Sequence, residues 1–182
     1  MVLPMNRTLP IAIGTTLAAL LLTAGPAAAQ QASLDDASGD GANKGLDITR
    51  VTVRNLDHAV VAKVRFEESV RGDVIVSIDP RGATGLRLVS KHRPAGTTKN
   101  RILPGAFTDG DSSSDTSTCG GFRVRWSADQ PTVTMRMPSR CLQDGDFGAI
   151  RFAVLTERGS DTDWAPEAAD GDIGSSRWVA RG

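Results

Sequence analysis

The chain has 182 residues with 21 basic and 21 acidic side chains, so its formal net charge at pH 7 is zero. This balance argues against a nucleic-acid partner and against attachment to an anionic membrane surface, because both depend on an excess of Lys and Arg. After removal of an N-terminal segment, the remaining length suits one domain.

The first 29 residues have the features of a secretory signal peptide. Arg7 precedes an apolar run at 11–22, and small residues at 27–29 form a cleavage pattern. The run is too short to span a bilayer comfortably, which argues against an uncleaved anchor. We therefore expect cleavage before Gln30 and a secreted mature chain of 153 residues with no membrane anchor.

The next stretch, residues 30–45, is small and polar and has almost no large apolar side chain. Burial cannot repay the entropy of ordering such a stretch. We interpret it as a flexible leader, and we interpret residues 46–182 as a single domain.

Short stretches of the domain alternate apolar and polar residues and are separated by turn residues. The expected strands outside the cysteine hairpin are 50–54, 60–66, 74–78, 86–90, 101–103 and 149–156. The stretch at 74–78 is apolar on both faces, which predicts a central strand. No segment has a sustained helical period. We predict an all-β fold of about eight strands, an antiparallel two-sheet β-sandwich of jelly-roll-like type.

The stretch from Cys119 to Cys141 predicts a β-hairpin closed by a disulfide. Its expected arms are 122–126 and 133–137, joined by a turn at 128–131. A bulge at Gly120–Gly121 is expected to correct a one-residue mismatch between the cysteines and the strand pairing. We interpret the disulfide as a structural staple, because the chain is expected to be secreted and no C-x-x-C motif is present.

Four D-x-D pairs occur, at 109–111, 144–146, 161–163 and 170–172. Such a pair can present two carboxylates to Ca²⁺, but Ca²⁺ takes six to eight oxygens and no pair completes an EF-hand loop. A structural calcium site and ordinary solvated turns both explain the pattern. His58 and His92 have no partner at metal-ligand spacing. We therefore assign no metal ligand and no cofactor.

Catalytic motifs are absent from the sequence. There is no G-x-S-x-G motif, and Glu67 and Glu68 are neighbours on a strand and should point to opposite faces. We assign no catalytic residue and expect a non-catalytic binding or interaction protein at the cell exterior. A secreted hydrolase, or an accessory subunit of an extracellular enzyme, is the alternative, with a site assembled from distant loops.

Two tryptophans are candidates for a ligand surface. Trp126 and three phenylalanines fall on inward faces of strands, which leaves Trp164 and Trp178 as platforms for a polysaccharide. Asp161 and Asp163 would be their hydrogen-bonding neighbours. Packing of both indoles against the core or an edge is the competing interpretation, and a cell-envelope protein is the other candidate partner.

Three segments carry a resemblance to known proteins: DITRVTV at 47–53, MPSRCL at 137–142, and DWAP at 163–166 before a terminal Trp. With them the chain resembles a group of small exported proteins of high-GC Gram-positive bacteria, a resemblance that implies a β-sandwich and no activity. The strand layout is more distantly similar to DOMON and family-9 carbohydrate-binding modules, which bind sugars or haem. Met135 and Met137 are expected in the core, so haem ligation is not carried over.

Overall fold

A computed structural model describes residues 30–40, 46–68, 71–107 and 119–182. The expected signal peptide and the D-x-D pair at 109–111 lie outside these residues. The described part of the chain contains ten β-strands and two short 3₁₀ helices, η1 (Ser139–Cys141) and η2 (Gln143–Gly145). No helix in these ranges is long and apolar enough to cross a membrane.

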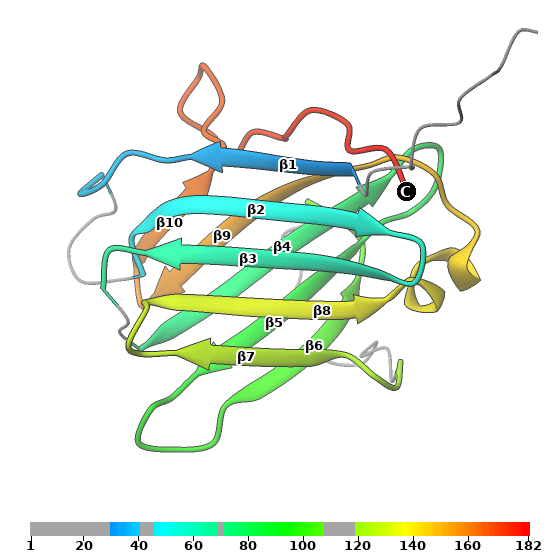
Figure 1. Cartoon of the computed structure of the whole chain (residues 1–182). Helices are drawn as coiled ribbons and strands as arrows, with labels where there is room; N and C mark the ends of the chain where they lie inside the picture. Colours follow the sequence, from blue (N-terminus) through cyan, green and yellow to red (C-terminus); the bar gives the residue numbers. More distant parts are fainter. Residues whose placement is uncertain (1–29, 41–45, 69–70, 108–118) are drawn as a thin grey trace, which may run out of the picture.

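The strands form two antiparallel sheets of five strands each, which confirms the expected two-sheet architecture (Figure 1). The front sheet has the order β1 (Gln30–Asp35), β2 (Ile48–Leu56), β3 (Ala59–Phe66), β8 (Thr132–Pro138), β7 (Arg123–Ser127). The rear sheet has the order β10 (Asp161–Ala165), β9 (Ile150–Arg158), β4 (Gly72–Pro80), β5 (Leu86–His92), β6 (Lys99–Pro104).

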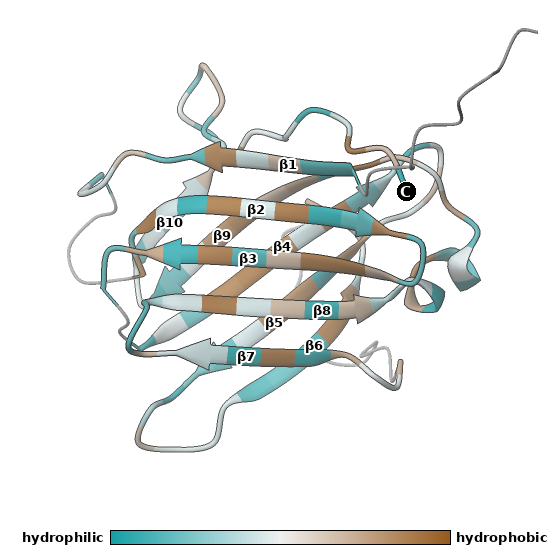
Figure 2. Ribbon diagram, viewed as in Figure 1, coloured by the Kyte–Doolittle hydropathy of each residue, from teal (hydrophilic) through white to brown (hydrophobic). Residues whose placement is uncertain are grey.

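The core lies between the sheets and follows from the period-two alternation of the strands, visible as alternating bands in Figure 2. Phe152 of the rear sheet and Met135 of the front sheet are fully buried. β4 is buried along nearly its whole length and lies between β9 and β5, so the expected central strand is confirmed.

The predicted hairpin and disulfide are also confirmed. Trp126 pairs with Val133, and Cys119 is bonded to Cys141 with a Cα–Cα distance of 5.6 Å. The expected bulge is absent from this pairing, because β7 and β8 end before either cysteine and Cys141 lies in η1. Gly121, with a φ of +95°, lies in the turn that leads into β7, so strand parity does not govern the cysteines.

The interpretation of 30–45 as a flexible leader is wrong for its first part. Residues 30–35 form β1, which pairs along its full length with β2. Ala32 is buried, Leu34 packs against the core, and Ser33 Oγ lies 3.1 Å from Thr52 Oγ1. A strand with one face on the core needs apolar residues only at alternate positions, because successive side chains point to opposite faces. Its backbone pairing with β2 orders the polar positions as well.

The C-terminal segment packs along the open edge of the rear sheet. β10 pairs with the second half of β9, a strand that the sequence did not predict. Beyond it, Val179 exchanges two backbone hydrogen bonds with Ile150, and Ser176 Oγ accepts from the N–H of Phe152. The tail therefore covers this edge, as expected from its apolar residues, although Trp178 remains 38% exposed.

Candidate functional site

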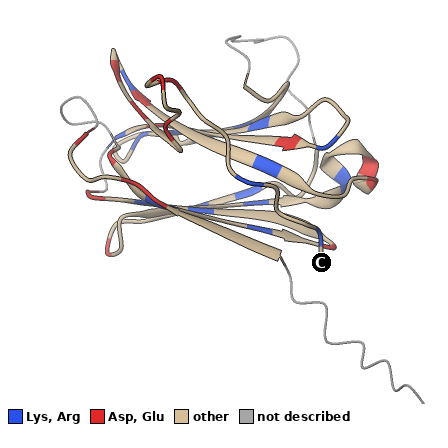
Figure 3. Ribbon diagram, turned by 90° about the horizontal axis from the view of Figure 1, so that it is seen from above, with Lys and Arg blue, Asp and Glu red and all other residues tan. Residues whose placement is uncertain are grey.

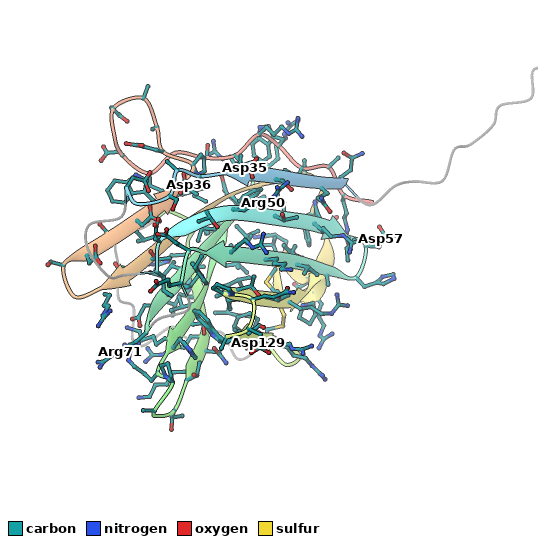
Figure 4. The ribbon with its side chains drawn as sticks, turned by 60° about the vertical axis from the view of Figure 1, so that its left-hand side comes forward. Asp35, Asp36, Arg50, Asp57, Arg71 and Asp129 are labelled. Carbon is teal, nitrogen blue, oxygen red and sulfur yellow. A yellow bond between two sulfur atoms is a disulfide. The ribbon has the colours of Figure 1, made fainter. Side chains whose placement is uncertain are left out.

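Four carboxylates meet where the β1–β2 connection passes the edge strand β10. We call Asp36, Asp40, Asp47 and Asp163 the acidic cluster. Asp36 follows β1, as Figure 4 shows, and Asp47 precedes β2. One carboxylate oxygen from each of Asp40, Asp47 and Asp163 lies within 4.8 Å of the other two. Figure 3 shows many of the Asp and Glu positions in loops at this end, while many Lys and Arg positions lie along the strands.

The start of β2 is held rigidly against the rear sheet. The N–H of Ile48 donates to Asp163 Oδ2 at 2.6 Å, and Thr156 Oγ1 donates to the carbonyl of Leu46 at 2.7 Å. Gly72 allows this close approach, because a Cβ there would lie 2.8 Å from Leu46 Cδ1. The chain on either side of Asp47 is therefore fixed to both β9 and β10.

The turn after β1 folds back over the same segment. The N–H of Gly39 donates to Asp47 Oδ2 at 2.7 Å, and the N–H of Asp36 donates to the carbonyl of Thr49 at 3.1 Å. Gly39 has a φ of +86°, a left-handed conformation that glycine adopts without strain. These bonds bring Asp36 and Asp40 to the side of Asp163.

Two oxygens of the cluster are shielded from water and accept no hydrogen bond from an N–H or a hydroxyl group. They are Asp36 Oδ2 and Asp47 Oδ1, and the Asp47 carboxyl also lies within hydrogen-bonding reach of the Glu67 carboxyl. The Asp163 side chain is only 9% exposed. None of the four ion pairs within the described residues involves the cluster. Buried carboxylates normally have such partners, because an unpaired one loses its hydration without compensation.

The ionisation of the cluster reflects this crowding. Burial, and then the charge of Asp163, raises the pKa of Asp36 to about 7. Burial also raises the pKa of Asp163 to about 6. The hydrogen bond from the N–H of Ile48 lowers this pKa and so limits the increase. Burial raises the pKa of Asp47 as well, with a further increase from the neighbouring Glu67 carboxyl. Close carboxylates without a cation thus hold protons near neutral pH.

The arrangement offers part of the oxygen set that Ca²⁺ takes. Asp40, Asp47 and Asp163 each bring one oxygen within 4.8 Å of the other two, and the Asp36 carboxyl lies close enough to be affected by their charges. Ca²⁺ takes six to eight oxygens, so bidentate carboxylates, main-chain carbonyls or water would supply the rest. A divalent cation would also offset the repulsion between the carboxylates, which adds to burial in raising the pKa values of Asp36 and Asp163.

The residues predicted as a ligand surface are divided between different places. Asp163 belongs to the acidic cluster, and Asp161 Oδ1 is another buried oxygen without a partner. Trp164 follows Asp163 on the strand and pairs with Leu155, so its indole lies on the opposite, outer face of the rear sheet. Trp178 lies in the C-terminal tail beside Arg81 and Arg151.

Of the three D-x-D pairs that the structure describes, the one at 161–163 contributes to the cluster. Asp170 accepts a hydrogen bond from the N–H of Asp172 at 3.4 Å, as expected of a turn carboxylate. Asp36, Asp40 and Asp47 were not predicted as ligands from the sequence. Asp36 and Asp40 lie in the stretch interpreted as a leader, and Asp47 lies just after it. The concentration of aspartates in this part of the chain was the available signal for an acidic site.

The histidines remain outside any metal-ligand arrangement found among the described residues. His92 stacks on Trp126 with ring centres 4.1 Å apart, and burial together with the Arg93 charge lowers its pKa. Its role is therefore packing at the β5–β7 side of the sandwich.

No protein-family model matches this chain, and neither a curated protein nor a solved structure does. The similarity to DOMON and family-9 carbohydrate-binding modules stays a prediction. The functional conclusion therefore rests on the geometry described above.

Proposed function

We propose that this protein is an exported, non-catalytic binding protein whose β-sandwich is completed by a Ca²⁺ ion at the acidic cluster. The observation that carries the proposal is the convergence of carboxylates from the β1–β2 connection and from β10, with buried oxygens that have no partner. Such an arrangement is costly without a cation and favourable with one.

Export is supported by two independent features. The chain begins with a signal-peptide pattern, and it contains a disulfide between Cys119 and Cys141, a bond that persists in oxidising compartments. Calcium modules outside the cell bind with a Kd of about 10⁻⁴ to 10⁻³ M, which sets the affinity we expect.

The ion would have a definite mechanical role. Asp36 continues from the edge strand of the front sheet, whereas Asp163 belongs to the edge strand of the rear sheet. A shared Ca²⁺ would therefore connect the two edge strands at one end of the sandwich. The ion would add to the hydrogen bonds that already hold the start of β2 against β9 and β10.

A hydrolase is the second candidate, because paired carboxyls with pKa values near 7 and 6 are also a pattern of acid/base catalysis. Such a pair must face a substrate cleft. One cavity of about 190 Å³ among the described residues, beside Arg71 and Arg158, is lined by side chains outside the acidic cluster, so it does not supply this cleft.

Calorimetric titration of the chelator-treated mature protein with CaCl₂ tests the proposal. We expect one saturable site, lost in Asp163→Asn and in Asp47→Asn. Asp129→Asn is the matched control, since Asp129 is an exposed acidic residue in the β7–β8 turn, away from the cluster in Figure 4.

Absence of calcium binding in the folded wild-type protein would overturn the proposal, as would equal loss in the control variant. If calcium does not bind but Asp163→Asn abolishes hydrolysis of a polysaccharide substrate, the hydrolase interpretation takes its place.

A further inference from the structure

A second built feature lies at the other end of β4, on the outer face of the rear sheet. We call Asp79, Arg81, Phe107, Arg151 and Trp178 the Trp178 patch. The guanidinium carbon of Arg81 lies 4.8 Å from the centre of the indole ring, and that of Arg151 lies 5.3 Å from it. Backbone pairing of the neighbouring Val179 with Ile150 fixes the tryptophan in place.

Arg151 is held on three sides. Its Nε donates to Asp79 Oδ2 at 2.6 Å, and its guanidinium lies over Trp178 and 5.7 Å from the ring centre of Phe107. These contacts fix the orientation of the guanidinium N–H donors of Arg151 before a ligand binds, which lowers the entropy cost of binding.

The five residues of the patch carry one net positive charge. Asp79 neutralises Arg151, whereas Arg81 forms no ion pair with any described carboxylate and its guanidinium lies over the indole. The two guanidinium carbons are at most 10.1 Å apart, the sum of their distances to the same ring centre. Neighbouring anionic groups on one polymer could therefore contact both.

The geometry also restricts the ligand. Both guanidinium groups lie close to the exposed indole, so a neutral sugar could stack there only by displacing a cation from the ring. A sugar that carries a carboxylate needs no place on the ring face, because its anionic group binds the outer edge of a guanidinium and its ring then lies against the exposed part of the indole.

We propose that the Trp178 patch binds an anionic polysaccharide, with Arg81 and Arg151 contacting its carboxylates and Trp178 contacting a sugar ring. The patch is separate from the acidic cluster. Gly72, at the start of β4, contacts Leu46 beside the cluster, whereas Asp79 lies near the end of the same strand. At about 3.3 Å per residue, the two sites lie roughly 20 Å apart along the strand.

The experiment measures binding of the metal-free mature protein to hyaluronan, a polymer of alternating glucuronate and N-acetylglucosamine, by tryptophan fluorescence at low salt. The variants are Arg81→Gln, Arg81→Lys and Trp178→Leu. Arg123→Gln is the control, because Arg123 is an exposed arginine on the front sheet. Neutral dextran and inorganic polyphosphate are the comparison polymers, and each variant is first checked for a wild-type unfolding temperature.

We expect saturable binding to hyaluronan that weakens about tenfold in Arg81→Gln and less in Arg81→Lys, since one charge-assisted contact is worth about a factor of ten or more. Binding should fall as salt screens the charges. Absence of binding, equal loss in Arg123→Gln, or equal affinity for dextran would overturn the proposal. Tighter binding to polyphosphate would also overturn it and assign the patch to a phosphate polymer.

Discussion

The two ends of the sandwich are closed by different chemistry. At the end that carries η1 and η2, on the right in Figure 1, a disulfide joins Cys119 to Cys141. At the other end, the acidic cluster brings together carboxylates that repel one another and leave buried oxygens without partners. The covalent end is closed by the protein's own atoms, whereas in our proposal the acidic end is closed by a cation.

This difference separates two kinds of stability. A disulfide acts mainly by restricting the unfolded chain, and its contribution does not depend on calcium. A bound ion stabilises the folded state in proportion to the logarithm of its concentration. The following predictions test whether the two ends behave in these separate ways.

The largest effect is expected at the covalent end. The double variant Cys119→Ser, Cys141→Ser should lower the free energy of unfolding by about 3 kcal/mol, because the bond closes a loop of 22 residues. Denaturant unfolding, with and without Ca²⁺, measures this loss. We expect the same decrease in both conditions, and a decrease seen only after removal of calcium would contradict the separation of the two ends.

Calcium should have a slightly smaller effect. At about a hundred times its Kd, the ion should stabilise the wild-type protein by about 2.7 kcal/mol, a rise of roughly 5–10 °C in the unfolding temperature. Asp163→Asn should remove this rise. In chelator the same variant should be at least as stable as wild type, since it removes a buried charge but keeps an acceptor for the Ile48 N–H.

Calorimetry in both conditions measures the two Asp163→Asn effects. A variant that is equally destabilised with and without calcium would show that Asp163 acts only through its backbone hydrogen bond.

The pH dependence of the metal-free protein gives the next prediction. Asp36 and Asp163 have folded-state pKa values near 7 and 6, above the ordinary aspartate value of 3.8. The folded state therefore binds more protons than the unfolded state, and stability contributed by these groups is lost as the pH rises through 6 to 7. Without calcium, the unfolding temperature should rise as the pH is lowered from 8 to 5.

With saturating Ca²⁺ this trend should flatten or reverse, because the ion binds the deprotonated carboxylates. Thermal scans at several pH values, with and without chelator, measure the change. An unfolding temperature that falls steadily on acidification in chelator would show that the cluster does not hold protons near neutral pH.

The two ends also differ in how well they could be predicted from the sequence. The disulfide end is formed by residues of one hairpin, whereas the acidic end is formed by residues far apart in the chain. Cys119 and Cys141 flank one hairpin, so the local alternation of 122–126 and 133–137 was sufficient to place them together. The acidic cluster joins residues 36, 40 and 47 to residue 163. Its assembly depends on β10, an edge strand whose few apolar positions gave no clear period.

β1 was missed because a composition argument counts the burial of side chains alone. Its small polar residues bury little, but its backbone is paired with β2 from Gln30 to Asp35. Once β1 is regarded as a flexible leader, Asp36 and Asp40 are lost from any search for ligands. The strands rich in Val, Ile, Phe and Met were predictable, because their alternation is set by the core itself.

The smallest effect should come from Trp126, which lies on the same side of the sandwich as His92. Its Nε1–H donates to Ser90 Oγ at 3.0 Å, and its ring stacks between Phe66 and His92. Trp126→Phe keeps an aromatic ring in this stack but removes the donor, so we expect a loss of about 1 kcal/mol. Ser90 Oγ also lies 2.8 Å from Asn100 Oδ1, so the hydroxyl keeps a partner in the variant and the loss stays small. Denaturant unfolding should show this loss unchanged by calcium, because the ring touches no member of the acidic cluster. A loss that disappears on calcium binding would mean that this aromatic stack and the acidic cluster, which Phe66 connects through its strand partner Ile48, are energetically coupled.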